Sequence, residues 1–365
     1  MRSLYIHLPF CIKKCNYCDF ASYAGCYDAA ERYVDAVIAE MKEYPPQPIQ
    51  TVYLGGGTPS SLEKEQIVRL MNEVRVHFCL SEDAEITIEA NPATLTREKL
   101  LAYRNAGINR ISVGVQSFDD KELSFLGRLH SAAQAEQTLS LVRESGFDNA
   151  SLDLMFGLPN QEVKTLKKSL ERAIALCPEH ISCYALKIEE GTPLYAAWLA
   201  QDFLPMEDDA VADLYTLVRE TLTGAGYTQY ELSNFCLTGR QSRHNSVYWQ
   251  CGEYIGLGAG AASYYNSKRY CNTPDLQEYL SGKRAVEEEE ISIEEQMSEF
   301  VILGLRMVRD GISEQEFKKR FGVDMDAVFG KQLQKHQKFI KREGGVLTLT
   351  PEAYFVSNAI FADFI

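Results

Sequence analysis

Residues 4–18 read Leu-Tyr-Ile-His-Leu-Pro-Phe-Cys-Ile-Lys-Lys-Cys-Asn-Tyr-Cys, an apolar run that ends in three closely spaced thiols. Cys11, Cys15 and Cys18 follow the pattern C-x3-C-x2-C. Structural zinc sites usually take four ligands in paired knuckles, and the sequence contains no second C-x2-C. Three soft thiolates instead suit an iron–sulfur cluster that leaves one iron open to another ligand. The same spacing could also form one buried helix stripe, but Pro9 directly before it favours a loop.

Composition limits the class of protein. The chain has 365 residues, of which 45% are hydrophobic and 24% charged, as in a folded protein with one large domain or one large and one small. A formal net charge of −14 disfavours a nucleic-acid-binding surface. The N-terminus does not read as a signal peptide, and no apolar stretch is long enough to span a membrane. Ten cysteines without a secretion signal indicate a reducing compartment, so we expect a cytoplasmic protein without a transmembrane segment.

A strand-then-helix rhythm fills the first half of the chain. Short apolar or β-branched runs predict strands at 3–8, 51–54, 85–89, 110–115, 150–155 and 180–184. Apolar residues at three- and four-residue spacing predict helices between them, at 28–43, 62–77, 133–145 and 163–175. The separations suit βαβ crossovers, so an α/β fold with a parallel sheet is expected.

Polar or glycine-rich positions recur where these predicted strands end. The turn Gly55–Thr58 follows the second strand, Glu89 ends the third, Gln116 ends the fourth, and Asp153 lies within the fifth. Each could singly be an ordinary loop, capping or surface residue. In a parallel barrel, however, the carboxyl ends of all strands meet on one face, which carries the functional site. Together these positions therefore predict one site at that end.

The cysteine pattern, with an aromatic residue before its last Cys, resembles the radical S-adenosylmethionine (SAM) enzymes. The flanking Tyr-Ile-His-Leu-Pro-Phe-Cys resembles the oxygen-independent coproporphyrinogen oxidase-like branch of that family. The resemblance implies a partial (β/α)6 TIM-like barrel in which the three thiolates hold a [4Fe-4S] cluster. It also implies that the fourth iron binds the amino and carboxylate groups of SAM, and that electron transfer cleaves SAM to a 5′-deoxyadenosyl radical.

By the same resemblance, SAM-binding positions of the family match Tyr5, Tyr17, Gly55, Gly56, Gly57, Thr58, Glu89, Gln116, Arg128, Asp153 and Ala185. Arg128 could instead pair with a surface carboxylate. The sequence leaves open whether one SAM molecule binds or two.

The second half of the chain carries a candidate haem site. His244 is followed by Tyr248 and Trp249, an imidazole beside two flat aromatic rings, which suits an axial ligand and a porphyrin face. A lone His among aromatics is more often a packed core residue, so that alternative stays open. The pattern H-N-x-x-Y-W resembles the sequence mark of the haem chaperones of this branch. The glycine-rich stretch from Gly252 to Gly260 is expected to form a close-packed turn near the site.

Three regions are expected. Residues 1–200 should form the partial barrel with its [4Fe-4S] and SAM sites, 201–290 a barrel extension, and 291–365 a small, mostly helical winged-helix-like domain. The run Glu287 to Glu290 predicts a solvated linker. Lysines in the last region could form a nucleic-acid face, but acidic residues balance them, which favours a solvated helix surface.

Three functions remain to be separated. True oxygen-independent coproporphyrinogen oxidases carry another Cys two residues after the third, where this chain has Phe20, and an extension before the cluster. These departures favour a haem chaperone that passes haem to an acceptor protein. One expected location of that acceptor is the membrane surface. The alternatives are a coproporphyrinogen oxidase, which makes protoporphyrinogen by radical decarboxylation, and an RNA-modifying radical enzyme. The negative charge speaks against the last, so no nucleic-acid partner is expected.

Overall fold

The computed structural model describes residues 2–365, with Glu287 by its backbone alone. Its main feature is a curved twelve-stranded sheet that stays open, in the order β14-β13-β12-β11-β1-β4-β5-β6-β7-β8-β10-β9. Seven neighbouring strands are parallel, and they are β11 (Glu253–Leu257), β1 (Arg2–Leu8), β4 (Pro48–Gly56), β5 (Cys79–Ala90), β6 (Arg110–Gln116), β7 (Ala150–Phe156) and β8 (His180–Ala185). The six strands expected from the sequence are all present, and the predicted partial barrel is confirmed.

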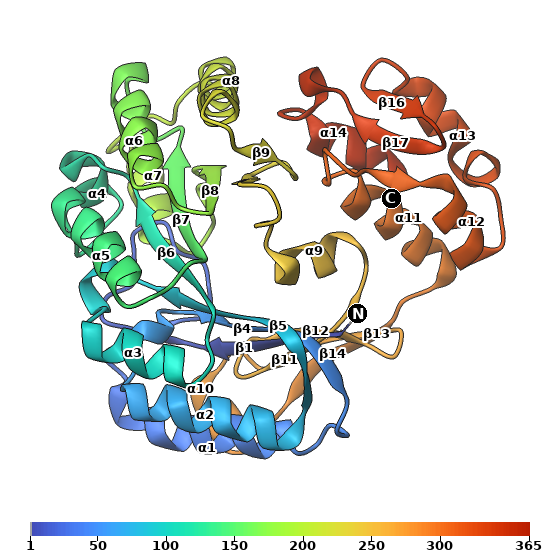
Figure 1. The fold of residues 1–365 in the computed structure, drawn as a ribbon. Coiled ribbons are helices and arrows are strands. Elements are labelled where there is room, and N and C mark those ends of the chain that lie inside the picture. The colour runs from blue at the N-terminus through green and yellow to red at the C-terminus, as the bar shows by residue number, and fades with distance from the viewer. Residues whose placement is uncertain (1) are drawn as a thin grey trace.

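Helices cover the outer, convex side of this sheet (Figure 1). They are α1 (Ala30–Met41), α2 (Lys64–His77), α3 (Arg97–Asn105), α4 (Asp120–Phe125), α5 (Ala132–Glu144) and α6 (Val163–Ala175). The apolar stripe of each helix packs on strand residues such as Leu4, Val52 and Ile88, which are fully buried. The predicted helices are confirmed, whereas the short helices α3 and α4 were not anticipated.

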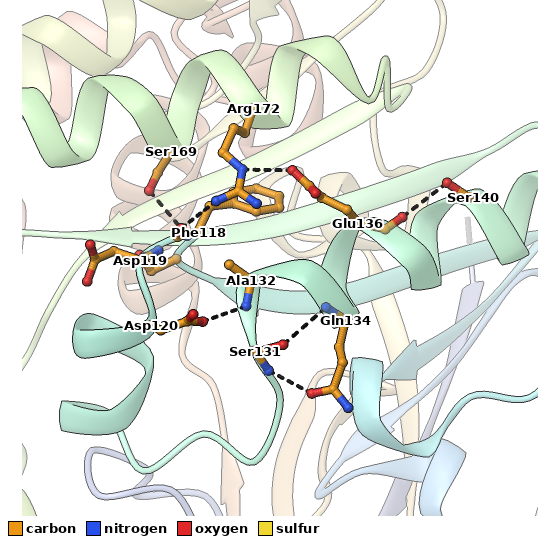
Figure 2. Close-up of polar contacts among 11 residues, drawn as sticks. Phe118, Asp119, Asp120, Ser131, Ala132, Gln134, Glu136, Ser140, Ser169 and Arg172 are labelled. Carbon is orange, nitrogen blue, oxygen red and sulfur yellow. Dashed lines mark hydrogen bonds and ion pairs between the residues drawn. The ribbon is translucent and has the colours of Figure 1, made fainter.

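Polar contacts fix the outer helices to the ends of the strands (Figure 2). The Arg172 side chain of α6 donates to Glu136 of α5 at 2.7 Å and to the Phe118 carbonyl, just after β6, at 2.8 Å. Ser131 and Gln134 form a capping box that begins α5. The segment after β6, which leads toward Arg128, is thus held by α6, which is itself bonded to α5.

The prediction of a turn at 252–260 is wrong for the first part of that stretch. Glu253–Leu257 is strand β11, which lies parallel to β1 in the sheet. A Cβ atom on Gly256 would come within 2.1 Å of the Ala262 carbonyl oxygen, so this glycine is required by close backbone packing. The turn itself begins at Gly258, whose φ of 106° is in the region that favours glycine.

An antiparallel meander continues from β11 through β12 (Ala262–Tyr265), β13 (Lys268–Asn272) and β14 (Ala285–Glu290), with α10 (Leu276–Leu280) before the last strand. The predicted acidic linker is therefore wrong, because residues 285–290 are an edge strand. Cations on β13 explain why acids are tolerated there, since Lys268 forms an ion pair with Glu288 at 2.5 Å.

The opposite edge of the sheet is completed after α7 (Pro193–Leu199) and α8 (Asp208–Gly224) by β9 (Thr228–Gln229) and β10 (Asn234–Cys236). Helix α9 (Arg243–Trp249) then lies on the inner, concave side of the sheet (Figure 1). Within residues 2–365, no helix combines the length and the apolar character needed to cross a lipid bilayer.

The C-terminal region, residues 291–365, faces the concave side (Figure 1). It contains α11 (Ile293–Gly304), α12 (Glu314–Phe321), α13 (Met325–Lys335), α14 (Ser357–Phe361) and a small sheet of β15 (Ile312–Ser313), β17 (Val346–Leu349) and β16 (Ile340–Glu343). Buried aromatic rings give it a hydrophobic core of its own, joined by Leu232 of the preceding region. This arrangement of helices with a small sheet agrees with the expected winged-helix-like fold.

Candidate cluster and SAM site

Protein contacts alone fix the cysteine loop that follows β1. The short strands β2 (Phe10–Cys11) and β3 (Tyr23–Ala24) pair and hold the two ends of the loop together. In its middle, the Asn16 side chain donates to the Phe125 carbonyl at 2.7 Å, and the Leu194 N–H donates to the Asn16 carbonyl at 2.8 Å. The loop is therefore anchored both to the segment after β6 and to α7.

The donor set of this loop fits a cluster better than a single ion. Among the described residues, no three His, Cys, Asp or Glu side chains converge where one metal ion could sit. The thiolates of a [4Fe-4S] cubane bind different iron atoms, so they need no common point. Burial raises the pKa of the Cys11 and Cys18 thiols, so both stay protonated until a cation compensates for burial of the thiolate. Cys11, Cys15 and Cys18 would be the ligands.

Two of these thiols contact other predicted site residues. The Arg128 guanidinium lies 3.3 Å from the Cys15 sulfur and also donates to the Gly114 carbonyl at the end of β6. The Thr58 hydroxyl lies 3.5 Å from the Cys11 sulfur. The alternative of a surface ion pair for Arg128 is thus wrong, because its guanidinium points inward and joins β6 to the cysteine loop.

The glycine turn after β4 packs directly on the strand that leads to Cys11. Gly56 has a φ of 107°, and a Cβ atom there would lie 2.5 Å from the His7 ring. A Cβ atom on Gly57 would lie 2.8 Å from the Phe10 backbone. On its other side, the Gly56 N–H donates to the Glu89 carboxylate at 3.1 Å. Close backbone approach therefore explains why this turn, which also includes Gly55, is built from glycine.

Two carboxyl groups on the concave side, Glu89 and Asp153, lie close enough to affect each other electrostatically. Glu89 accepts from the Tyr53 hydroxyl at 2.8 Å, and Asp153 accepts from the Ser112 hydroxyl at 3.3 Å. Burial, together with the neighbouring charge of Asp153, raises the pKa of Glu89 to about 7 against the opposing hydrogen bond from Tyr53. Burial likewise raises the pKa of Asp153, while the positive charge of Arg110 acts in the opposite direction. Both groups are suited to bind a cation or an ammonium group.

Gln116 has a left-handed backbone conformation that is uncommon for a residue with a side chain. It ends β6 at a bulge, with a φ of 70°, which is uncommon for any residue except glycine. Its side-chain oxygen accepts from the Tyr184 hydroxyl of β8 at 2.9 Å. Such strain is concentrated at functional sites, and here it directs the amide toward the carboxyl ends of the strands.

The remaining predicted positions lie around the same end of the sheet. The Tyr5 hydroxyl is 2.9 Å from His7 Nδ1, Tyr17 packs beside Leu126 and Met155, and Ala185 ends β8. The structure thus gathers the cysteines, the glycine turn and the interior polar groups at one end. Their individual contacts with SAM stay predictions.

The haem candidates are arranged differently from the expectation. His244 is 1% exposed, its Nδ1 bonds the Thr51 hydroxyl and its Nε2 the Tyr248 hydroxyl, both at 2.8 Å, and its ring stacks on Tyr53. Burial, with the charge of Arg110, lowers its pKa to about 3, so the ring is neutral. His244 is a packed interior residue, and the arrangement does not offer it to a haem iron.

The other two haem candidates differ in accessibility. Tyr248 is committed to His244 and packs edge-on against Tyr254. Trp249 is half-buried, with its ring 4.5 Å beneath the Arg306 guanidinium of the C-terminal region.

Sequence reasoning missed three residues of this interior network. Tyr53 bonds Glu89, Tyr184 bonds Gln116, and Arg110 is an almost completely buried cation at the start of β6. A tyrosine at the end of a strand, or an arginine at its start, normally faces solvent. The signal that could have found them is that each lies in a predicted parallel strand. Both faces of such a strand are covered, so its polar side chains need partners in the interior.

Comparison with known proteins places these features in a family. The profile of the radical SAM superfamily matches residues 5–173, and that of the HemN C-terminal domain matches residues 291–356. The haem chaperone HemW of Bacillus subtilis is 36% identical over 378 aligned positions, which cover 100% of this chain and 99% of the relative. HemW of Escherichia coli is 41% identical over 269 positions, covering 71% of this chain and 69% of the relative.

Among solved structures, coproporphyrinogen III oxidase (HemN) of Escherichia coli superposes with a TM-score of 0.86 at 23% identity, covering 100% of this chain and 89% of that one. At this identity the likeness establishes the fold alone.

Proposed function

The chain belongs to the radical SAM superfamily and, within it, to the HemW family, and on this basis we propose that it is a haem chaperone that passes haem to an acceptor protein. The observation that carries the proposal is the match to HemW relatives over the whole chain, from the cysteine loop to the C-terminal region. The radical SAM cofactors, a [4Fe-4S] cluster and SAM, would be held by the cysteine loop and the residues around it. When bound, such a cluster supplies the electron that cleaves SAM.

The alternative function is that of a coproporphyrinogen III oxidase, whose fold this chain shares. Phe20, which occupies the position of the oxidase's additional Cys, is 61% exposed and cannot replace a thiol. The proposed chaperone therefore keeps the fold and cofactor residues of the oxidase without its substrate chemistry.

We also propose where in the cell the chain works and which kind of protein receives the haem. Cys79 and Cys177 are exposed free thiols, which persist in a reducing compartment, and this supports a cytoplasmic location. The acceptor is proposed to be a haem protein, with the membrane surface as one place of transfer.

One experiment on a single sample tests the proposal. The protein is reconstituted anaerobically with iron and sulfide, titrated with haem, and assayed for conversion of coproporphyrinogen to protoporphyrinogen. We expect a saturable Soret band near one haem per chain and no product. Sustained turnover without saturable haem binding would establish the oxidase instead.

A further inference from the structure

A cavity of about 890 Å³ lies between the carboxyl ends of β7 and β8 and the C-terminal region. From the sheet side its walls include Met155, Phe156, Tyr184 and Leu186, and from the C-terminal region Arg306, Tyr354, Phe355 and Asn358. Cys18 of the cysteine loop lies on its wall as well. The volume is within the range of sites for cofactor-sized ligands.

We propose that this cavity, and not the H-N-x-x-Y-W stretch, is where the chain holds haem. The inference rests on the proposed chaperone function and adds to it the place and chemistry of binding. It follows from two features of the walls: their apolar surface and their partly exposed cation.

The apolar surface is the first feature. Phe20 is 61% exposed and Phe355 is 38% exposed, and both line this cavity together with the half-buried Met206. Large apolar side chains left uncovered around one cavity mark a binding surface, because contact with a flat apolar ligand would remove them from water. The porphyrin faces of haem are ligand surfaces of this kind.

The cation is the second feature. The Arg306 side chain is 24% exposed on the cavity wall, and its ion pair with the buried Glu231 is long, at 3.8 Å. A partly exposed guanidinium with only a long ion pair, at the edge of an apolar cavity, is suited to a propionate carboxylate. Lys187 is a second cation on the wall, while the acids there are Asp19, Asp208 and Glu189, of which the first two are exposed and solvated.

Trp249 connects this cavity to the H-N-x-x-Y-W stretch. Its ring lies 4.5 Å from the Arg306 guanidinium and so supports that side chain from below. Trp249 is therefore a positioning residue for Arg306, and His244 and Tyr248 hold α9, which carries Trp249, against the sheet.

Among the residues that the structure describes, no His lines this cavity. Haem iron in proteins is also bound by Met and Tyr side chains, and Met206 and Tyr354 line the cavity. We therefore expect a haem spectrum without an imidazole ligand, held mainly through the porphyrin faces and a propionate.

A second cavity of similar volume, about 880 Å³, provides the comparison. It lies between α4 and α6, and charged residues of both signs line it, including Lys121, Lys164, Glu162 and Arg172. Arg172 is already bonded to Glu136 and to the Phe118 carbonyl (Figure 2). The guanidinium of this cavity is therefore already bound, and the cavity differs from the proposed haem site in its many charged walls.

The test is a haem titration of the full chain carrying single substitutions. Asn358 is an exposed residue of α14 on the cavity wall, so Asn358→Trp fills the space without disturbing the core. Its matched control is Lys164→Trp, an exposed helical residue in the other cavity. We expect Asn358→Trp to weaken haem binding at least about tenfold and Lys164→Trp to leave it unchanged.

Three further variants distinguish the roles. Arg306→Gln and Phe355→Ala should each weaken binding several-fold, with thermal unfolding followed on the same samples. His244→Gln should keep the haem spectrum of the wild type, because no imidazole binds the iron at the proposed site. Wild-type affinity in Asn358→Trp, or a haem band lost only in His244→Gln, would overturn the cavity proposal while leaving the chaperone function intact. No haem binding by the wild-type chain would contradict both.

Discussion

Glu89 is the residue whose ionisation should be easiest to observe. Its pKa of about 7 places its charge change in the physiological range, and only the ionised form attracts the ammonium group of SAM. We therefore expect SAM affinity of the reconstituted protein to increase from pH 6 to pH 8, about tenfold overall, and then to level off. Glu89→Gln should bind weakly at every pH. An equally steep pH dependence in that variant would assign the titration to another group.

Arg110 provides the opposite charge for this region. It acts electrostatically on Glu89, Asp153, His180 and His244, and it lowers the pKa of both carboxyls. Removing its charge in Arg110→Met should move the midpoint of pH-dependent SAM binding upward, whereas Arg110→Lys should move it less. Isothermal titration of SAM across pH measures the midpoint, which a purely structural defect would leave in place. Identical midpoints in both variants and the wild type would exclude this role.

The residues that could be predicted from sequence are those with local patterns. The three cysteines and the glycine turn have fixed spacing or backbone geometry, so they are recognisable without the fold. Arg110 and Tyr53 gain their roles only from residues more than twenty positions away, and nothing local distinguishes them from strand-end residues. His244 shows the converse, because its aromatic neighbours suggested a ligand, whereas hydrogen bonds from β4 and α9 occupy both ring nitrogens.

Among the elements, the cysteine loop is the one that a single substitution should inactivate. Cys15→Ser removes one of three ligands, so we expect the variant to lose the [4Fe-4S] cluster on anaerobic reconstitution, measured as iron and sulfide per chain. Cys79→Ser, at an exposed thiol far along the chain, is the control and should retain it. A full cluster in Cys15→Ser would show that Cys15 is not one of the cluster ligands.

Helix α9 is an element whose contribution is structural support. His244→Leu would leave the Tyr248 hydroxyl without its partner and the Thr51 hydroxyl with only its bond to Ser3, at a cost of about 1–3 kcal/mol in the free energy of unfolding. Denaturant unfolding measures this loss. His77→Leu, which breaks one bond to the Tyr44 carbonyl in a half-buried position, should cost clearly less. Equal losses would mean that the α9 contact contributes no more than a peripheral histidine.

For the whole molecule, alternation of strand and helix was sufficient to predict the parallel sheet, and the family resemblance added the partial barrel. The alternation was insufficient at the end of the sheet formed by β11 to β14. The acidic run at 287–290 resembles a linker because its stabilising cations lie on β13, some twenty residues earlier. Strand β11 resembles a glycine turn because its glycine is needed for contact with β12, which the local sequence does not reveal.

The pairing of β1 with both β4 and β11 has a consequence for biosynthesis. β1 leaves the ribosome well before residues 253–257, which complete one of its two edges. Until those residues have been made, the strand that leads into the cysteine loop lacks its backbone partners on that edge. Contacts so distant in sequence form late. We therefore expect the cluster to be inserted only after β11 has been synthesised.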